Sequence, residues 1–291
     1  MLAKAGTAFD SDDYQFEIKW DGTRCICFRD SNGYRLINRR RIEMIERYPE
    51  LSVLSKLASG TVLDGEIVVM KNGKPDFPSL LSREQARDPL KAKVLAKVSP
   101  ATYVVFDQLY SGFSSVMKKP LIERRQILAQ TLGRLRSRFV IFSAAVVGSG
   151  RAMFDEATKL GIEGVVAKRL ASAYTPGRRS DAWIKIKRQE TLACVIVGFV
   201  PEGEDDFSAL IVAGECDGIL TALGKVGTGF DAGLRARLNE AFSKRLRESP
   251  VVPCKIRGKW LEPTLYCTVR CMERTASGQL RAPVFGELYD H

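Results

Sequence analysis

The residue that best combines reactive chemistry with a suitable position is Lys19. It opens Lys19-Trp20-Asp21-Gly22-Thr23-Arg24, between a strand-like run and an Asp-Gly turn, where its amine is expected at the edge of a pocket. A lysine acts as a nucleophile only after it loses a proton, which neighbouring cations or a metal ion favour. Lys185 and Lys187 could supply that charge, because alternate residues of a strand point to one face. Taken alone, Lys-x-Asp-Gly also fits a surface lysine before a tight turn.

Two carboxylates lie in comparable positions. Glu66 follows a glycine within a strand-like run over 61–70, and Glu163 precedes a glycine at the start of another run. If both converge on the pocket of Lys19, they could hold Mg²⁺ or Mn²⁺, since hard cations prefer oxygen ligands and phosphate. A lone glutamate is more often solvated at a sheet edge. The residues alone leave both interpretations open.

Other residues could contact a base or phosphate groups. Phe106 lies in an apolar run and could stack on a base, although core packing explains a single phenylalanine equally well. The candidates for phosphate contacts are basic residues in or beside strand-like runs and loops, namely Arg24, Arg39, Lys168, Arg178 and Arg179. A solvated basic face is the alternative for part of this set. The five arginines within 121–138, a segment predicted to be helical, are expected to form an exposed charged face.

Composition argues against several kinds of chemistry. His291 is the only histidine among 291 residues, which disfavours a Ser-His-Asp or Cys-His nucleophile and a histidine-ligated metal site. The seven cysteines include no Cys-x-x-Cys pair and are expected to be reduced, buried thiols. A formal charge of +11 favours a polyanionic partner, most simply nucleic acid. No apolar run suits a membrane span and no signal peptide is recognisable, so we expect no membrane association and a cytoplasmic protein.

The order of expected elements indicates an α+β chain with antiparallel sheets. Before residue 189, strands are expected over 16–28, 35–38, 61–70, 101–109, 139–143, 164–168 and 182–187. Helices are expected over 43–57, 79–97, 121–135 and 150–160. Beyond that point the expected elements are a helix over 231–246 and short strands over 193–200, 207–212, 220–226, 259–261 and 265–272. Five short strands with one helix suit an OB-fold β-barrel. We therefore predict two domains, 1–189 and 190–291.

Five short segments occur in a fixed order: Lys19–Arg24, Leu63–Glu66, Val104–Asp107, Glu163–Lys168 and Trp183–Lys187. As an ordered set they resemble the ATP-dependent DNA ligases of the covalent nucleotidyltransferase superfamily, most closely the bacterial end-joining and repair ligases. Three further segments are similar to this group: Arg47–Leu51, Val226–Phe230 and Trp260–Pro263. The resemblance covers nearly the whole chain. It implies a nucleotidyltransferase (adenylylation) domain of antiparallel sheets with flanking helices, followed by an OB-fold domain.

The resemblance also implies a reaction. Lys19 would attack the α-phosphate of ATP and hold AMP as a phosphoramidate, and AMP would then pass to a 5′-phosphate at a nick in duplex DNA. The 3′-hydroxyl would finally displace AMP. Such transfers depend on positioning and charge neutralisation more than on proton shuttling, so they need no histidine.

The resemblance assigns a role to each candidate. The residues expected to bind ATP or AMP are Glu17, Ile18, Arg24, Arg39, Glu66, Phe106, Lys185 and Lys187, with Glu17 reading adenine and Phe106 stacking on it. Glu66 and Glu163 would support Mg²⁺ or Mn²⁺. The residues expected to meet DNA are Arg39, Lys168, Arg178 and Arg179. Arg281 is the expected phosphate contact of the C-terminal motif.

The chain departs from the family pattern in two places. Arg40 stands where glycine is usual, and Gly286–His291 lacks the usual basic residues. Self-adenylylation is therefore expected to be slow unless Arg281 compensates.

Two other functions stay open. An RNA ligase or a capping-type guanylyltransferase would also use Lys-x-Asp-Gly, and competition between ATP and GTP would separate them from an ATP-dependent enzyme. A non-catalytic nucleic-acid-binding module would fit the incomplete C-terminal motif, but it would never gain covalent AMP. The partners expected for the ligase are nicked duplex DNA and repair proteins, with the chain acting as a monomer.

Overall fold

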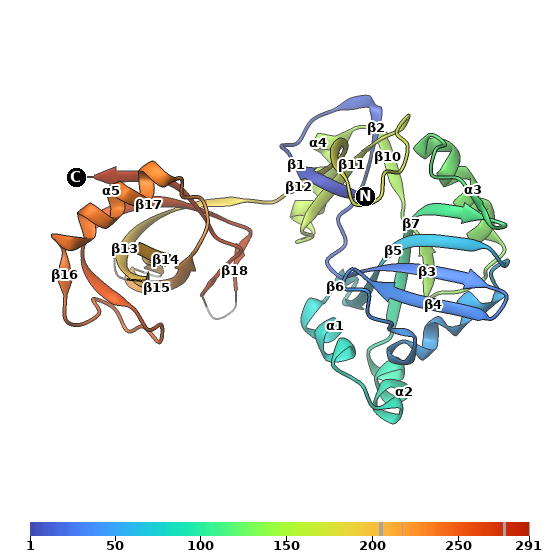
Figure 1. The fold of residues 1–291 in the computed structure, drawn as a ribbon, viewed down its shortest axis with the longest axis horizontal. Coiled ribbons are helices and arrows are strands. Elements are labelled where there is room, and N and C mark those ends of the chain that lie inside the picture. The colour runs from blue at the N-terminus through green and yellow to red at the C-terminus, as the bar shows by residue number, and fades with distance from the viewer. Residues whose placement is uncertain (204–205, 217, 276–277, 291) are drawn as a thin grey trace. The chain divides into compact units, whose positions relative to one another are not determined.

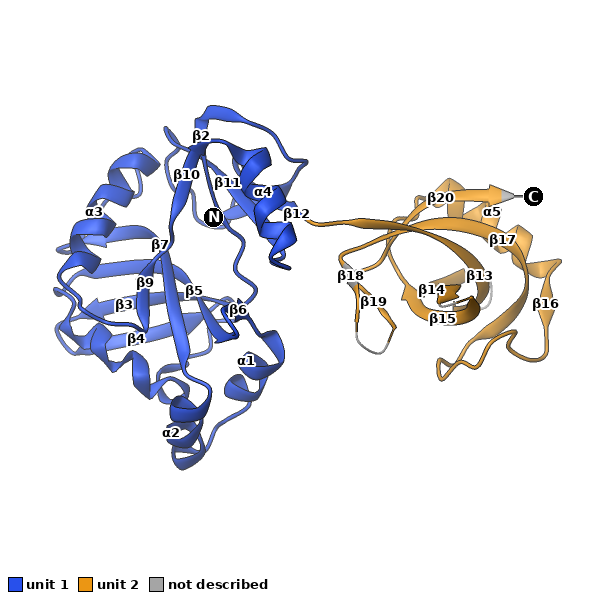
Figure 2. Ribbon diagram, turned by 180° about the vertical axis from the view of Figure 1, so that it is seen from behind, with its two compact units in different colours: residues 1–187 blue, residues 188–291 orange. Residues whose placement is uncertain are grey.

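The chain forms two compact units in the computed structural model, residues 1–187 (unit 1) and residues 188–291 (unit 2) (Figures 1 and 2). Residues 1–290 are described except 204–205, 217 and 276–277. The division falls close to the expected domain boundary after residue 189, and the assignment of two functional domains stays a prediction. Among the described helices, we find none with the length and apolar character that a membrane span requires.

One sheet of unit 1 combines strands from both ends of the unit. Its order is β1–β12–β11–β2–β10, with bounds Leu2–Ala5, Arg179–Lys187, Gly164–Arg169, Ser11–Ile18 and Ala145–Gly148. Phe16 on one face packs with Ala157 of helix α4 (Gly150–Lys159) in an apolar cluster. Successive side chains alternate between the faces of a strand, so Glu17 lies on the opposite face. There Glu17 pairs with Val166, and Val166 with Lys185, in one row across three strands.

The other sheet of unit 1 has the order β4–β3–β5–β7–β8. Its bounds are Gly33–Asn38, Thr23–Asp30, Thr61–Lys71, Ala101–Ser111 and Ser114–Ser115, with β6 (Lys74–Pro75) and β9 (Val140–Phe142) added beside β5 and β7. Arg24 of β3 lies opposite Glu66 of β5. Cys25 and Cys27 are fully buried in the main core of this unit, as expected, whereas Cys216 and Cys254 of unit 2 are only half-buried.

Two predicted helices of unit 1 differ from the observed elements. The segment 43–57 forms two 3₁₀ helices, η1 (Ile45–Arg47) and η2 (Pro49–Lys56), because Pro49 disfavours the α conformation at Tyr48 before it. The segment 79–97 is broken into α1 (Phe77–Glu84) and α2 (Pro89–Val98). The Asp88 side chain accepts a hydrogen bond from Leu90 N at 3.0 Å, which caps α2 at its proline.

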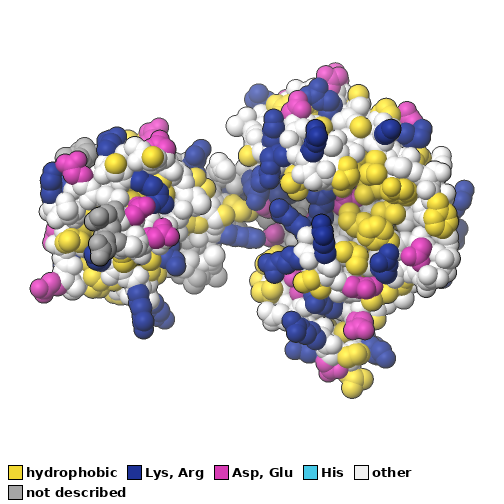
Figure 3. All heavy atoms as spheres, viewed as in Figure 1, with side chains coloured by type: hydrophobic (Ala, Val, Ile, Leu, Met, Phe, Trp, Pro, Cys, Tyr) yellow, Lys and Arg dark blue, Asp and Glu magenta, His cyan; other side chains and the backbone are white. Residues whose placement is uncertain are grey.

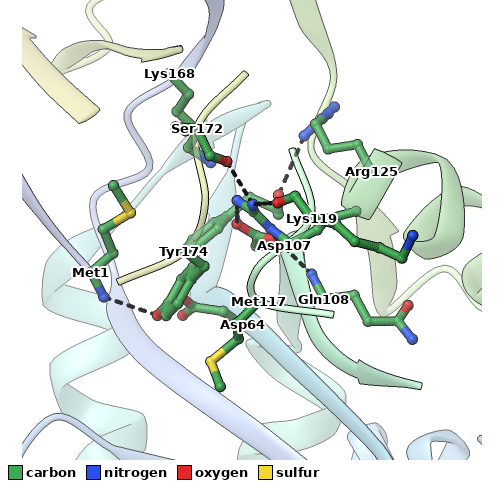
Figure 4. A network of polar contacts seen from close by, with 12 residues as sticks. Met1, Asp64, Asp107, Gln108, Met117, Lys119, Arg125, Lys168, Ser172 and Tyr174 are labelled. Atoms are coloured by element: carbon green, nitrogen blue, oxygen red, sulfur yellow. Dashed lines mark hydrogen bonds and ion pairs between the residues drawn. The ribbon is translucent and has the colours of Figure 1, made fainter. Parts of the chain in front are cut away.

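A buried polar network ties helix α3 (Leu121–Gly133) to the sheets (Figure 4). Arg124 and Asp107 are both fully buried and form two parallel bonds, Nε–Oδ1 at 2.8 Å and Nη2–Oδ2 at 2.9 Å. Arg124 Nη1 also donates to the carbonyl of Ser172 at 2.7 Å. Two residues on, Tyr174 donates to Asp64 Oδ2 at 2.8 Å. The chain over 170–174 is thereby fixed to both β7 and β5.

Unit 2 is built on an antiparallel sheet that curls strongly. Among its described residues the order is β15–β14–β13–β17–β16, with β20 paired to β17. The bounds are Ile219–Val226, Asp206–Cys216, Glu190–Glu202, Lys259–Cys271, Leu246–Arg247 and Val284–Asp290, with β18 (Glu273–Arg274) and β19 (Leu280–Arg281) forming a separate pair. Helix α5 (Ala232–Ser243) places Leu238 and Phe242 in the core. The predicted strands 259–261 and 265–272 form one strand, because a register shift between Ile196 and Gly198 of β13 accommodates Pro263.

We expect Arg124→Met to lower the free energy of unfolding of unit 1 by about 3–5 kcal/mol, because Asp107 would keep a buried carboxylate without its countercharge. Urea unfolding measures the change, and hydrogen exchange of the β7 amides assigns the transition to unit 1. The matched control is Arg134→Met at the exposed end of the same helix, with an expected change within about 0.5 kcal/mol. Equal destabilisation by both substitutions would contradict the importance of the buried pair.

Candidate functional site

Most of the predicted site residues surround one pocket of unit 1 with a volume of about 150 Å³. Its lining comes from both sheets and from the 19–20 connection between them: Ala3, Glu17, Ile18, Lys19, Trp20, Arg24, Glu66, Phe106, Val166, Lys168, Trp183 and Lys185. Glu163 and Lys187 do not line it but contact residues that do or lie beside them. The five ordered segments therefore meet in space.

Lys19 lies where the chain crosses from β2 to β3, and so from one sheet to the other. Its backbone N–H donates to Gly164 O at 2.9 Å, which fixes the start of the crossing. Gly22 ends it, and a Cβ there would lie 2.2 Å from the carbonyl oxygen of Ile67. Only glycine fits so close to the neighbouring strand. The Lys19 side chain is 22% exposed, so its amine is accessible from the pocket.

Glu163 holds two lysines at one edge of the pocket. Its Oε2 forms an ion pair with Lys19 Nζ, and its Oε1 forms one with Lys187 Nζ at 2.5 Å. Burial alone would raise the pKa of Glu163, but the two lysines outweigh it and hold that pKa below its ordinary value. The pKa of Lys185 is lowered by partial burial and by the positive charges of Lys187 and Arg179. The edge of the pocket is thus a cluster of cations around one carboxylate, suited to phosphate.

Aromatic rings form the apolar wall of the pocket. Phe106 and Trp183 meet edge to face with ring centroids 5.7 Å apart. The indole Nε1 atoms of Trp20 and Trp183 are buried, and within the described residues neither has a hydrogen-bond partner. Buried donors of this kind are costly unless something satisfies them. The wall therefore offers both a stacking surface and unused donors to a ligand.

Glu17 is 2% exposed and is surrounded by positive charge and donors. Lys168 Nζ lies 2.8 Å from its Oε1, Gln15 Nε2 donates to the same atom at 2.7 Å, and Arg125 Nη1 donates to it at 3.1 Å. Burial lowers the pKa of Lys168, although Glu17 acts in the opposite direction. Lys168 Nζ also lies 4.1 Å from the centroid of the Phe106 ring.

Two expectations from the sequence are corrected here. Lys168 was expected to contact DNA, but it is only 2% exposed and faces Glu17 inside the pocket. The arginines of the 121–138 segment were expected on an exposed face, but Arg124 and Arg125 are 0% and 8% exposed. Both point inward because they lie at helical spacing from the buried Leu121 and Leu128.

Arg24 lines the pocket, and hydrogen bonds fix the position of its guanidinium. Its guanidinium binds Asp64 with Nε–Oδ1 at 3.0 Å and Nη2–Oδ2 at 2.7 Å, and Nη2 also donates to Tyr174 Oη at 3.2 Å. Asp64 is fully buried, so this countercharge fixes Arg24 beside Glu66.

A larger hollow of about 670 Å³ adjoins the pocket, since Arg24 and Glu66 line both. Besides Arg24, four arginines line this hollow, which we call the basic groove: Arg39, Arg40, Arg47 and Arg87. Asn38 Oδ1 accepts hydrogen bonds from Arg40 N at 2.9 Å and Ile42 N at 3.0 Å, which holds the turn that carries Arg39. On the face of unit 1 seen in Figure 3, many Lys and Arg side chains lie at the surface. Such positive charge favours binding of a polyanion.

Besides Glu163 and Lys187, which lie beside the pocket, three predicted residues lie outside both hollows. Arg178 and Arg179 are exposed at the start of β12, where Arg179 Nη1 donates to the carbonyl of Ala3. Arg281 belongs to β19 of unit 2, so its predicted contact with phosphate stays a prediction. His291, the end of the incomplete motif, lies outside the described residues.

Sequence reasoning missed Arg125, Asp64 and Tyr174. Arg125 had a usable signal, since it lies four residues after Leu121 and three before Leu128 on the apolar side of its helix. Asp64 lies in the segment Leu63–Glu66, two residues before Glu66, and nothing in the sequence indicates that it is buried. Tyr174 follows an irregular chain and gave no periodic signal.

Comparison with known proteins identifies the family. The profile of the ATP dependent DNA ligase domain matches residues 1–187, and that of the ATP dependent DNA ligase C terminal region matches residues 203–290. The multifunctional non-homologous end joining protein LigD of Pseudomonas aeruginosa is 33% identical over 288 residues, covering 94% of this chain and 33% of that protein. A DNA ligase of Methanoculleus marisnigri is 33% identical over 259 residues, covering 84% of this chain and 46% of that protein.

Solved structures agree with the sequence comparison. A mycobacterial DNA ligase D complexed with ATP and MES has a TM-score of 0.59 and 29% identity, and the match covers 100% of this chain and 94% of that one. The match confirms the predicted α+β fold, with a nucleotidyltransferase domain followed by an OB-fold domain. The chain spans half or less of the length of the two curated relatives above. It nevertheless matches the family over both of its units, and it belongs to the ATP-dependent DNA ligases.

Proposed function

We propose that this chain is an ATP-dependent DNA ligase that seals nicks between 3′-hydroxyl and 5′-phosphate ends. The observation that carries the proposal is the pocket in which the amine of Lys19 lies beside Glu163 and Lys187, next to an aromatic wall. A nucleophilic amine, a cluster of cations and a stacking surface are the parts that transfer of a nucleotide requires.

The reaction uses these parts in three steps. Lys19 Nζ, having lost a proton, attacks the α-phosphorus of ATP, so that a P–N bond forms and pyrophosphate leaves. A 5′-phosphate oxygen of nicked DNA then attacks the same phosphorus, which restores the lysine and leaves an adenylylated DNA end. The 3′-hydroxyl attacks the DNA phosphate, a phosphodiester forms, and AMP leaves. Lys185 and Lys187 lie where they can neutralise the phosphate charge that shifts in each step.

ATP fits the residues that line the pocket. The donors of Trp20 and Trp183 lack partners within the described chain, and Phe106 offers an aromatic edge and face to a base. The mycobacterial ligase D structure complexed with ATP supports the same choice. A binding module without catalysis is disfavoured, because it would not need an amine paired in this way. An RNA ligase or guanylyltransferase is disfavoured by the family matches.

Mg²⁺ or Mn²⁺ also fits, provided that ATP shares in holding it. Glu66 and Glu163 are the candidate ligands, and within the described residues no group of three His, Cys, Asp or Glu side chains could hold a metal. Mg²⁺ is commonly held by one or two carboxylates together with substrate phosphates. When bound, the ion would neutralise phosphate charge. Without a metal ion, burial raises the pKa of Glu66 to about 8, although the positive charges of Lys19 and Arg24 act against this rise.

Nicked duplex DNA would lie along the basic groove of Arg39, Arg40, Arg47 and Arg87. The end-joining relative supports a role in DNA repair, with repair proteins as partners. We also propose that the chain acts as a monomer in the bacterial cytoplasm.

The first prediction from the proposed function concerns the nucleophile. Incubation with ATP and Mg²⁺ should add one AMP to the protein, and Lys19→Ala should abolish the gain, because no other residue would take its place. Intact mass measures both after removal of any bound AMP. The control is Lys4→Ala, an exposed lysine outside the pocket, which should gain AMP normally. If Lys19→Ala gains AMP as the parent does, the assignment of the nucleophile is wrong.

The second prediction concerns pH. Glu66 has an ordinary pKa of 4.5 and a pKa of about 8 in the folded chain, so the folded protein keeps a proton that the unfolded chain loses between these values. The contribution of Glu66 to stability is therefore largest below pH 4.5 and is lost as the pH rises towards 8.

The test is the free energy of unfolding across this window without metal or nucleotide. Glu66→Gln cannot ionise, so its stability relative to the parent should increase as the pH rises. The exposed Glu46→Gln is the control and should follow the parent. Parallel curves for the parent and Glu66→Gln would show that Glu66 is not perturbed.

The third prediction concerns DNA. Affinity for nicked duplex should fall steeply with salt, because arginines that neutralise phosphates release counterions. Arg39→Ala should weaken binding to all sequences and reduce the logarithmic salt slope by about 1, whereas Arg134→Ala should not. Fluorescence anisotropy over a salt series measures the slope. An unchanged slope in Arg39→Ala would remove this residue from the DNA surface.

A further inference from the structure

We propose that Arg125 sets the selectivity for the adenine base, by fixing the Glu17 carboxylate and the backbone of Phe106 at the pocket. The inference rests on the proposed function and deepens it. Arg125 lies on α3, outside the five ordered segments, and it does not line the pocket itself. It therefore acts through two residues that do, as a positioning residue.

The contacts of Arg125 join the two sheets of unit 1. Nη1 donates to Glu17 Oε1 of β2 at 3.1 Å and to the Phe106 carbonyl of β7 at 3.4 Å, and Nη2 donates to the Ser143 carbonyl at 2.7 Å. The Phe142 ring covers the guanidinium, with its centroid 4.2 Å from Cζ. With 8% exposure and these partners, the planar group has little freedom to move.

The contacts of Glu17 leave one oxygen suited to a ligand. Gln15, Lys168 and Arg125 all approach Oε1, at 2.7, 2.8 and 3.1 Å. A carboxylate oxygen has about two acceptor sites, so the hydrogen bonds from Gln15 and Arg125 saturate Oε1, to which Lys168 adds an ion pair, and the remaining capacity of the carboxylate is on Oε2. Glu17 lines the pocket, so that capacity is available to whatever the pocket binds.

An acceptor in this position distinguishes the two purine nucleotides. Adenine carries an amino group at position 6, which donates, whereas guanine carries an oxygen there, which accepts. A buried carboxylate accepts a hydrogen bond from the amino group of adenine, whereas it leaves the guanine oxygen without a donor and next to a negative charge. This preference for adenine depends on a carboxylate that cannot rotate away and on a Phe106 ring held at a fixed position in the pocket. Arg125 provides both constraints at once, which a lysine with a single ammonium could not do.

The test compares ATP with purine riboside triphosphate, which lacks the 6-amino group. The specificity constant for self-adenylylation is measured with each nucleotide for the parent, Arg125→Lys, Arg125→Met and Glu17→Ala. Both values come from one preparation, so their ratio does not depend on the folded fraction. We expect the parent to favour ATP and the ratio to fall about tenfold in the Arg125 variants, the order of one charged hydrogen bond lost. Glu17→Ala should lose the preference fully. The control Arg134→Lys, on an exposed residue at the end of the same helix, should keep the parental ratio.

Three results would overturn the proposal. Arg125 variants that are slower with both nucleotides but keep the parental ratio would show a purely structural role. A Glu17→Ala variant with an unchanged ratio would show that its carboxylate does not read position 6. Equal specificity constants of the parent for ATP and purine riboside triphosphate would also show that the Glu17 carboxylate does not read position 6. A parent that gains no nucleotide from ATP would instead overturn the proposed function, and this inference with it, before any variant is compared.

Discussion

The structure of unit 1 depends on one constraint, that charges buried between its two sheets must be paired. Asp64 and Asp107 are fully buried, and each carboxylate is met by a guanidinium through two parallel bonds. Such pairs add little net stability, because desolvation offsets most of the attraction, but the loss of one partner is severe. Their value lies in geometry. Each pair admits one arrangement of helix, strand and loop, and these arrangements define the pocket.

The same constraint explains why the reactive amine lies where it does. The chain crosses from one sheet to the other over residues 19–22, and Gly22 passes too close to Ile67 for any side chain. The crossing therefore has a fixed path, and Lys19 is held at its start by a backbone bond to Gly164. Because Gly164 directly follows Glu163, this bond brings the amine to its carboxylate partner. The position of the nucleophile follows from backbone pairing and not from the flexible side chain alone.

The sequence predicted the parts of the site that follow from short segments and strand alternation. Lys19, Glu66, Phe106 and Lys185 meet as expected, since each lies on or beside a run whose period is clear. The expectation that Lys168 is exposed was wrong for a physical reason. A charge on a strand is usually solvated, and the burial of Lys168 depends on Glu17, a partner 151 positions earlier in the sequence. The helix breaks at Pro49 and Pro89 were predictable from local rules that the apolar periodicity obscured.

The residues outside the recognised segments show what such segments leave out. A segment records the groups that touch substrate, while the groups that hold them in place can come from any element that packs nearby. Arg125 reaches Glu17 and Phe106 from a helix that is followed by three exposed arginines, Arg134, Arg136 and Arg138, so its residue type alone carries no information. Its information lies in its helical phase, which turns it inward with Leu121 and Leu128. A pocket that works by positioning and charge neutralisation needs such rigid support more than it needs a proton shuttle. The chain accordingly builds its site from lysine, arginine and carboxylate pairs, with its one histidine at position 291.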